Sequence, residues 1–214
     1  DINAMVFGMP RALFPALGTT VFGGPAAVGL LYAAPGAGAV LGALTSGWVS
    51  RVDRQGRATI LAVMAWGGSI ALFGLTDTLP LALALLALAG AADVISAVFR
   101  NTILQLSVPD RLRGRLSSMH IAVVTGGPRL GDAEAGIVAG LTSNEFSVVS
   151  GGVACMVGAV VIARVMPRLT AWRLSAHEAD AEGEVDLDPE VDPALDPDVG
   201  PAPGDRLTGG GSNS

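Results

Sequence analysis

The sequence predicts an all-α integral membrane protein, and three observations carry this prediction: composition, segment length and the placement of arginine. Half of the 214 residues are hydrophobic and 15% are charged, whereas soluble domains typically carry about 25% charged residues. A bilayer core needs roughly 20 apolar residues per crossing helix. Six segments meet this length, near residues 2–22, 25–48, 58–76, 80–99, 118–142 and 147–166.

The six segments differ in how apolar they are. The third and sixth are the most apolar, since Arg164 at the end of the sixth is their only charged residue. The fifth is the least apolar, because Arg129, Asp132 and Glu134 interrupt it. We retain the fifth segment as a span because its removal would spoil the alternation of charge between the connections.

Arginine supplies all 13 basic residues, and it is concentrated in every second connection. The basic connections follow the second, fourth and sixth spans, and their ten arginines are Arg51, Arg54, Arg57, Arg100, Arg111, Arg113, Arg115, Arg164, Arg168 and Arg173. The other connections contain no arginine and carry Asp77 and Glu145. Because short arginine-rich loops stay in the cytoplasm, we expect both termini on the cytoplasmic side.

Residues 174–214 differ in composition from the membrane part, residues 1–173. They hold 11 of the 19 acidic residues and repeat Asp-Pro every four residues at Asp188, Asp192 and Asp196. Like charges repel, proline removes hydrogen-bond donors, and few apolar residues are available for burial. The sequence predicts a disordered acidic cytoplasmic tail.

Four ionisable residues inside the spans are candidates for a substrate or proton pathway: Arg11, Asp93, Arg129 and Asp132. Charge at bilayer depth is costly, by about 2.5–3.5 kcal/mol on insertion scales, so such groups usually face protein or a water-filled cavity. Two alternatives stay open. Arg129 and Asp132, three residues apart, could simply pair on one helix face. Arg11 could extend to the interface or pair with Asp93.

Other kinds of chemistry find little support in the sequence. Gly38 and Gly42 form a Gly-x-x-x-Gly pair typical of close helix packing. Cys155 lies in an apolar run and is predicted to be a packed, inert thiol. No metal-ligand spacing, cofactor motif or catalytic set is visible, and no basic face predicts binding to nucleic acid. An integral-membrane enzyme is therefore the weakest of the functional alternatives.

Three strings resemble a known family of transporters. Residues 4–15, 108–115 and 126–132 are similar to segments of the enterobactin-exporter-like branch of the major facilitator superfamily, within its C-terminal six-helix half of nested 3+3 repeats. The superfamily's cytoplasmic loop has the pattern Gly-x-x-x-Asp-Arg-x-Gly-Arg, and this chain matches it in part. Counted from Gly47, the position expected to be Asp is Arg51, and the remaining pattern begins two residues later, at Asp53. The resemblance implies a cytoplasmic gating loop at Gly47, Arg51, Asp53, Arg54, Gly56 and Arg57.

The resemblance implies a secondary active transporter in the cell membrane that exports a small organic molecule, such as a siderophore or drug, with proton entry as the driving force. It implies no cofactor. Such a transporter encloses its pathway between two six-helix halves, so we expect this chain to be a fragment that needs an N-terminal half or a second copy. The alternative function is a non-transporting six-helix half that acts as a structural or interaction subunit.

Overall fold

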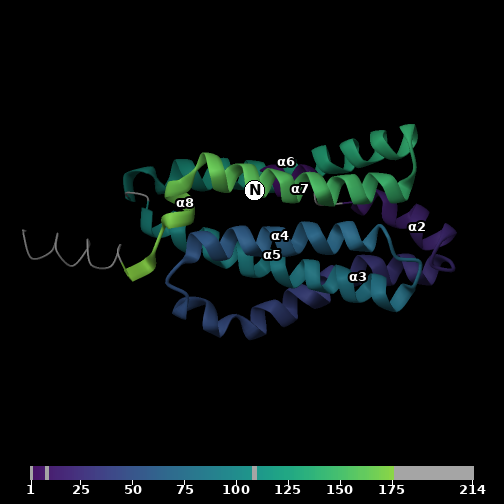
Figure 1. The fold of residues 1–214 in the computed structure, drawn as a ribbon, viewed down its shortest axis with the longest axis horizontal. Helices are drawn as coiled ribbons and strands as arrows, with labels where there is room; N and C mark the ends of the chain where they lie inside the picture. Colours follow the sequence, from purple (N-terminus) through teal and green to yellow (C-terminus); the bar gives the residue numbers. More distant parts are fainter. Residues whose placement is uncertain (1, 8–9, 108–109, 176–214) are drawn as a thin grey trace, which may run out of the picture. The chain divides into compact units, whose positions relative to one another are not determined.

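The computed structural model describes residues 2–7, 10–107 and 110–175, and the regular elements in these ranges are all helical (Figure 1). The elements in chain order are α1 (Ile2–Phe7), η1 (Arg11–Leu13), α2 (Phe14–Thr20), α3 (Pro25–Thr45), η2 (Ser46–Arg51), α4 (Gln55–Phe73), α5 (Leu79–Ser107), α6 (Asp110–Leu141), α7 (Asn144–Val165) and α8 (Pro167–Ala171). Local sequence explains several helix starts. Proline occupies the first position of α3 and α8, where its missing N–H costs nothing.

The first predicted span is an interrupted helix. α1 ends at Phe7, and the short 3₁₀ helix η1 begins after Pro10 and runs directly into α2. Proline has no N–H to donate and its ring crowds the preceding helical turn. Pro10 itself is not helical, whereas α3 and α6 continue through Pro35 and Pro128. That residues 2–22 cross the membrane once stays a prediction, with this break inside the span.

The predicted connection between the fourth and fifth spans is largely helical in the structure. α5 continues as a helix to Ser107 and α6 begins at Asp110, so Arg100 and Arg115 lie on helices. No glycine or proline interrupts residues 91–107, and the first breaker, Pro109, lies just before α6. Helix therefore extends through both polar flanks of this connection.

The helices pack in neighbouring pairs around one apolar core. α5 contacts both α3 and α4, α4 contacts α7, and α6 contacts α7 and α1. Figure 1 shows α6 and α7 side by side, with α3 on the far side of α4 and α5. An aromatic group closes one end of the core, where the Phe73 ring meets Phe14 and Phe22 at centroid distances of 5.9 and 6.1 Å.

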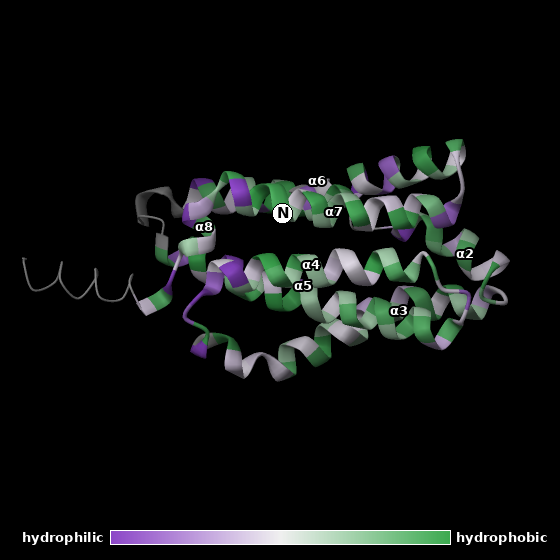
Figure 2. Ribbon diagram, in the orientation of Figure 1, coloured by the Kyte–Doolittle hydropathy of each residue, from purple (hydrophilic) through white to green (hydrophobic). Residues whose placement is uncertain are grey.

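The outer faces of the long helices are apolar. Leu44 on α3, Leu61 on α4 and Val165 on α7 are 79%, 69% and 74% exposed. Figure 2 shows hydrophobic residues along the lengths of α4, α5 and α7 and hydrophilic ones gathered near the ends of α4 and α7 beside α8. Surfaces of this kind suit lipid rather than water. Within the described part of the chain, four helical segments have the length and composition to cross a membrane: Pro25–Val49, Gln55–Phe73, Leu79–Leu106 and Asn144–Val165.

Two of the six predicted spans are absent from this set of four. One is the interrupted first span, and the other is α6, which contains Pro128 and several charged residues. The predicted disordered tail lies outside the described residues except for Leu174 and Ser175.

Candidate functional site

A cavity of about 130 Å³ brings together two of the four predicted pathway residues, Arg11 and Asp93. They are far apart in sequence, and come from η1 and α5. The remaining wall is apolar and comes from η1, α2, α3, α4 and α5. It consists of Pro10, Phe14, Pro35, Gly36, Ala39, Trp66, Ile70, Leu86, Ala89 and Gly90.

The interruption of the first helix determines how Arg11 meets this cavity. Arg11 is the first residue of η1, directly after Pro10, and its side chain is exposed. Its carbonyl oxygen accepts a hydrogen bond from the Tyr32 hydroxyl at 3.0 Å. The Tyr32 ring in turn packs edge-on against Phe14, at 5.2 Å between centroids. A side chain on α3 thus fixes the backbone at the point where the helix is broken.

Asp93 faces the cavity from α5 and has a basic partner on the same helix. Arg100 follows seven residues later, two turns along one face, and its Nη2 lies 3.8 Å from Asp93 Oδ1. The two side chains are 20% and 40% exposed, for Arg100 and Asp93 respectively. The separation exceeds hydrogen-bond length, so the pair is an electrostatic contact between charged groups.

The other two predicted pathway residues lie outside this cavity. Asp132 on α6 is half-buried and its Oδ1 accepts a hydrogen bond from the Ala12 N–H at 3.1 Å. It therefore satisfies a backbone donor in η1, one residue from Arg11. Arg129 is exposed on α6, and no ion pair joins it to Asp132, although both residues are described. In this conformation Asp132 therefore bonds to the backbone of η1 rather than to Arg129.

The glycine pair predicted for helix packing lies in the α3–α5 interface. A Cβ at Gly38 would collide with the backbone carbonyl of Ala87, and one at Gly42 would come within 2.9 Å of the Ala91 Cα. The approach is reciprocal, because a Cβ at Gly90 on α5 would collide with the carbonyl of Pro35. Only glycine permits such close backbone contact. This interface forms one wall of the Arg11–Asp93 cavity.

The predicted gating loop lies against the end of the membrane unit. Gly56 is buried, and a Cβ there would collide with the Leu169 carbonyl on α8. The Asp53 carbonyl accepts from the Leu174 N–H at 3.0 Å. Its carboxylate accepts from the Ser175 N–H and hydroxyl, at 3.0 and 2.6 Å. These Ser175 bonds hold the pKa of the exposed Asp53 carboxyl below its usual value.

The side chains of Arg51, Arg54 and Arg57 are exposed, and a Cβ added at Gly47 would meet nothing within 4 Å. The positive charges of Arg173 and Arg54 add to the lowering of the Asp53 pKa. We call the contact of Asp53 with Leu174 and Ser175 the Asp53 clasp.

Sequence reasoning did not identify three residues that shape these sites. Tyr32, Gly90 and Ser175 act through partners that lie 21, 55 and 122 residues away. The sequence contained a signal for Gly90, since it is the one glycine of its span. Nothing local pointed to Tyr32 or Ser175.

Comparison with known proteins gives a consistent family assignment. The sequence profile of the transmembrane secretion effector family matches residues 4–202. The chain is 30% identical over 173 residues to the enterobactin exporter EntS of Escherichia coli O6:K15:H31, covering 81% of this chain and 42% of that protein. The EntS of Shigella boydii serotype 18 is 30% identical over 171 residues, with 80% and 41% covered.

The chain thus spans about two fifths of the length of the curated relatives it matches. No solved structure matches it. The family consists of transporters rather than enzymes, and its members are multi-pass membrane proteins. The four long apolar helices agree with this assignment in length and composition. A match over most of the chain, together with these helices, shows that the chain belongs to the transmembrane secretion effector family of major facilitator superfamily transporters.

Proposed function

We propose that this chain works in a secondary active exporter that moves a small organic molecule out of the cell, driven by proton entry. The observation that carries the proposal is the cavity in which Arg11 and Asp93 meet beside an interrupted helix. The relatives named as enterobactin exporters support a siderophore as the cargo, and a drug is the second possibility to be tested.

In the proposed arrangement the chain crosses the cell membrane six times, as two repeats of three helices. The interrupted segment α1–η1–α2 forms the first crossing and α6 the fifth. Interrupted helices are tolerated at membrane depth where they line a cavity, and in several transporter folds they form the substrate site. The arginine-rich ends of α4, α7 and α8 support placing both termini in the cytoplasm. A second six-helix half or a second copy of the chain completes the pathway.

The proposed coupling group is Asp93. Protonation removes the negative charge that Arg100 faces and that shares a cavity with Arg11. Export driven by proton entry requires that the proton and the cargo bind alternately. A cargo that donates hydrogen bonds to the ionised Asp93 carboxylate therefore binds from the cytoplasm, and protonation of Asp93 from outside weakens that binding. Alternating access would rock this unit against its partner half between the two events.

The other predicted residues take supporting roles in this proposal. Asp132 positions the Arg11 segment by its bond to Ala12. Arg129 stays a predicted pathway residue, on the exposed surface of α6. The Asp53 clasp holds Leu174 and Ser175 against the start of α4. It belongs to the proposed cytoplasmic gating loop, which consists of Gly47, Arg51, Asp53, Arg54, Gly56 and Arg57.

The test is transport by the protein at its natural length, reconstituted in proteoliposomes with an imposed pH gradient. We expect Asp93→Asn to lower proton-driven movement of labelled enterobactin at least tenfold, and Arg11→Gln to lower it to a similar degree. Asp77→Asn is the matched control, because Asp77 is exposed in the connection between α4 and α5. Movement by Asp93→Asn at the wild-type rate would exclude Asp93 as the coupling group. A wild-type protein that moves no enterobactin but exports a cationic dye would replace the siderophore with a drug.

A further inference from the structure

The end of α1 meets α6 and α7 at two glycines. A Cβ at Gly131 on α6 would collide with the Met5 carbonyl oxygen and come within 3.0 Å of that of Val6. A Cβ at Gly151 on α7 would come within 2.5 Å of the Phe7 carbonyl oxygen. The glycines therefore let the last carbonyls of α1 come directly against both helices. Both glycines line a cavity of about 10 Å³ at this junction, together with Val6 and Phe7.

The break after α1 removes a helical partner from the Val6 carbonyl. The last carbonyls of a helix have no N–H partner within that helix. In a continuing helix the Val6 carbonyl would accept from the N–H of residue 10, but Pro10 has none. Carbonyl oxygens at a helix end also carry the negative end of the helix dipole, which favours a cation nearby.

Two side chains bring further oxygen atoms to the wall of the same cavity. Glu134 is half-buried and lies one turn after Gly131 on α6. Ser147 is buried and lies one turn before Gly151 on α7. The Ser147 hydroxyl donates to the Ala135 carbonyl at 2.8 Å, so its oxygen keeps lone pairs for a second contact. The cavity wall thus combines a carboxylate, a hydroxyl oxygen and helix-end carbonyls.

This set of oxygen atoms carries the negative charge of one carboxylate. None of the described residues that line the cavity is basic. Carboxylate, hydroxyl and carbonyl oxygens are ligands of hard cations. One positive charge neutralises Glu134, whereas a divalent ion would leave an excess charge in apolar surroundings, which is costly. A cavity of about 10–15 Å³ admits one water-sized sphere, so the ion would enter without its hydration shell.

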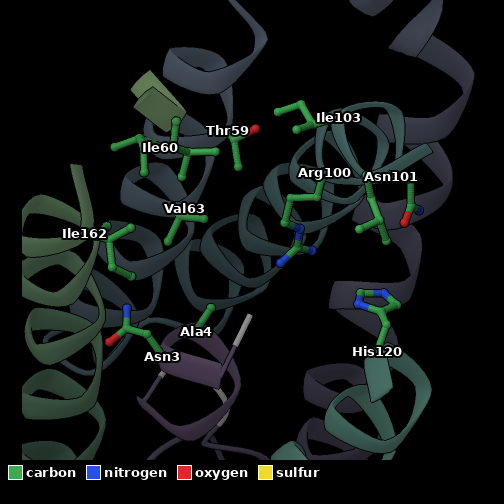
Figure 3. Close-up of a pocket in the computed structure, with 13 residues that line it drawn as sticks. Asn3, Ala4, Thr59, Ile60, Val63, Arg100, Asn101, Ile103, His120 and Ile162 are labelled. Carbon is green, nitrogen blue, oxygen red and sulfur yellow. The ribbon is translucent and has the colours of Figure 1, made fainter. Parts of the chain in front are cut away.

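The start of α1 is fixed on α7, at the opposite end from this cavity. The Asn3 amide donates to the Cys155 carbonyl at 3.0 Å, and a Cβ at Gly158 would collide with the Asn3 side chain. Figure 3 shows Asn3 beside Ile162, at the wall of a cavity of about 270 Å³. An ion at the end of α1 would therefore hold the second end of a helix whose first end is already attached.

We infer that Glu134, Ser147 and the end of α1 form a binding site for one Na⁺ ion. The ion joins α6 and α7 to α1 at the point where the first predicted span is interrupted. Carbonyls at the ends of interrupted helices coordinate sodium in other membrane transport proteins. The site goes beyond the proposed export and does not depend on it, because its ligands are separate from the Asp93 carboxylate.

The test is binding of radiolabelled Na⁺ to the protein at its natural length in nanodiscs, with empty nanodiscs as the blank. We expect saturable binding, and unlabelled Na⁺ should displace the label at least tenfold more effectively than the larger K⁺. Ca²⁺ should displace it no better than K⁺ does. A lack of saturable binding, or Ca²⁺ as the strongest competitor, would overturn the inference.

Variants assign the binding to this junction. Glu134→Gln should abolish the binding of Na⁺, because it removes the carboxylate charge, and Ser147→Ala should weaken it severalfold. Glu145→Gln is the matched control, since Glu145 is exposed in the first turn of α7 and does not line the cavity. Wild-type affinity for Na⁺ in Glu134→Gln would exclude the site.

Thermal unfolding separates loss of the ion from loss of the fold. The wild type should unfold at a higher temperature in NaCl than in choline chloride of equal ionic strength, because a bound ion stabilises the folded state. Glu134→Gln should unfold at the same temperature in both salts. Each variant is compared with itself, so a Na⁺-dependent rise that persists in Glu134→Gln would overturn the inference. These readouts measure ion binding, and their failure is distinct from a failure of proton-driven export.

Discussion

Helices α3 and α5 approach each other through glycine, whereas η1 and α6 meet through a hydrogen bond between a carboxylate and a backbone N–H. In the first interface, Gly38 and Gly90 place one backbone directly against the other. In the second, the half-buried Asp132 reaches the exposed Ala12. Close backbone packing tolerates almost no displacement, but a single hydrogen bond can break and reform. The Arg11–Asp93 cavity lies where the rigid pair borders the movable one.

The largest effect is expected from breaking the rigid interface with Gly38→Ala. The new methyl group would overlap the Ala87 carbonyl, so α3 and α5 must separate along their length. Overpacking of this kind costs about 1–3 kcal/mol, and we expect the thermal unfolding midpoint of the protein in nanodiscs to fall.

Gly36→Ala is the matched control, because it lies on the same helix with nothing within 4 Å of the added Cβ. Its unfolding midpoint should stay the same or rise slightly, since alanine favours helix over glycine. Equal midpoints for the two variants would mean that α3 and α5 do not pack this closely.

A smaller effect is expected from breaking the movable interface with Asp132→Ala. The Ala12 N–H loses its acceptor, and a hydrogen bond of this type contributes about 0.5–1.5 kcal/mol. Hydrogen exchange of the Ala12 amide should become faster while exchange in α3 and α5 is unchanged. Asp132→Asn keeps an oxygen acceptor and should exchange like the wild type. Equally fast exchange in both variants would show that the charge, rather than the acceptor, holds η1.

The rigid and movable regions were not equally predictable from sequence. The positions of α3, α4, α5 and α7 could be predicted from the apolar runs, and Pro25 marks the start of α3. An apolar segment in a membrane must satisfy its own backbone hydrogen bonds, and a helix does so. The Gly38–Gly42 pair pointed to close packing. The face of α5 against which this pair packs could not be predicted from the sequence, since Gly90 meets Pro35 only when α3 and α5 adopt one particular register.

The candidate site was predicted in part for a similar reason. A charged side chain in an apolar segment is costly to bury, so its presence there marks it as a functional candidate. Arg11 and Asp93 were both identified in this way. Which charges share a cavity depends on helix order and rotation, and these are tertiary properties. Asp132 therefore appeared equivalent to Asp93 in the sequence, although it bonds to the backbone of η1 rather than lining the cavity.

The smallest effect is expected at the Asp53 clasp, which lies outside both interfaces and is exposed to water. The hydrogen bonds from Ser175 lower the pKa of the Asp53 carboxyl from its usual 3.8. A group with a lowered pKa in the folded state stabilises the contact above its ordinary pKa and loses that contribution as the pH falls through the lowered value. Exchange of the Ser175 amide, corrected for its intrinsic pH dependence, should therefore stay protected from pH 7 to about 4 and lose protection below pH 3.8. Asp53→Ala should abolish the protection at every pH. Protection that is lost between pH 5 and 7 would contradict the lowered pKa and place another group in the contact.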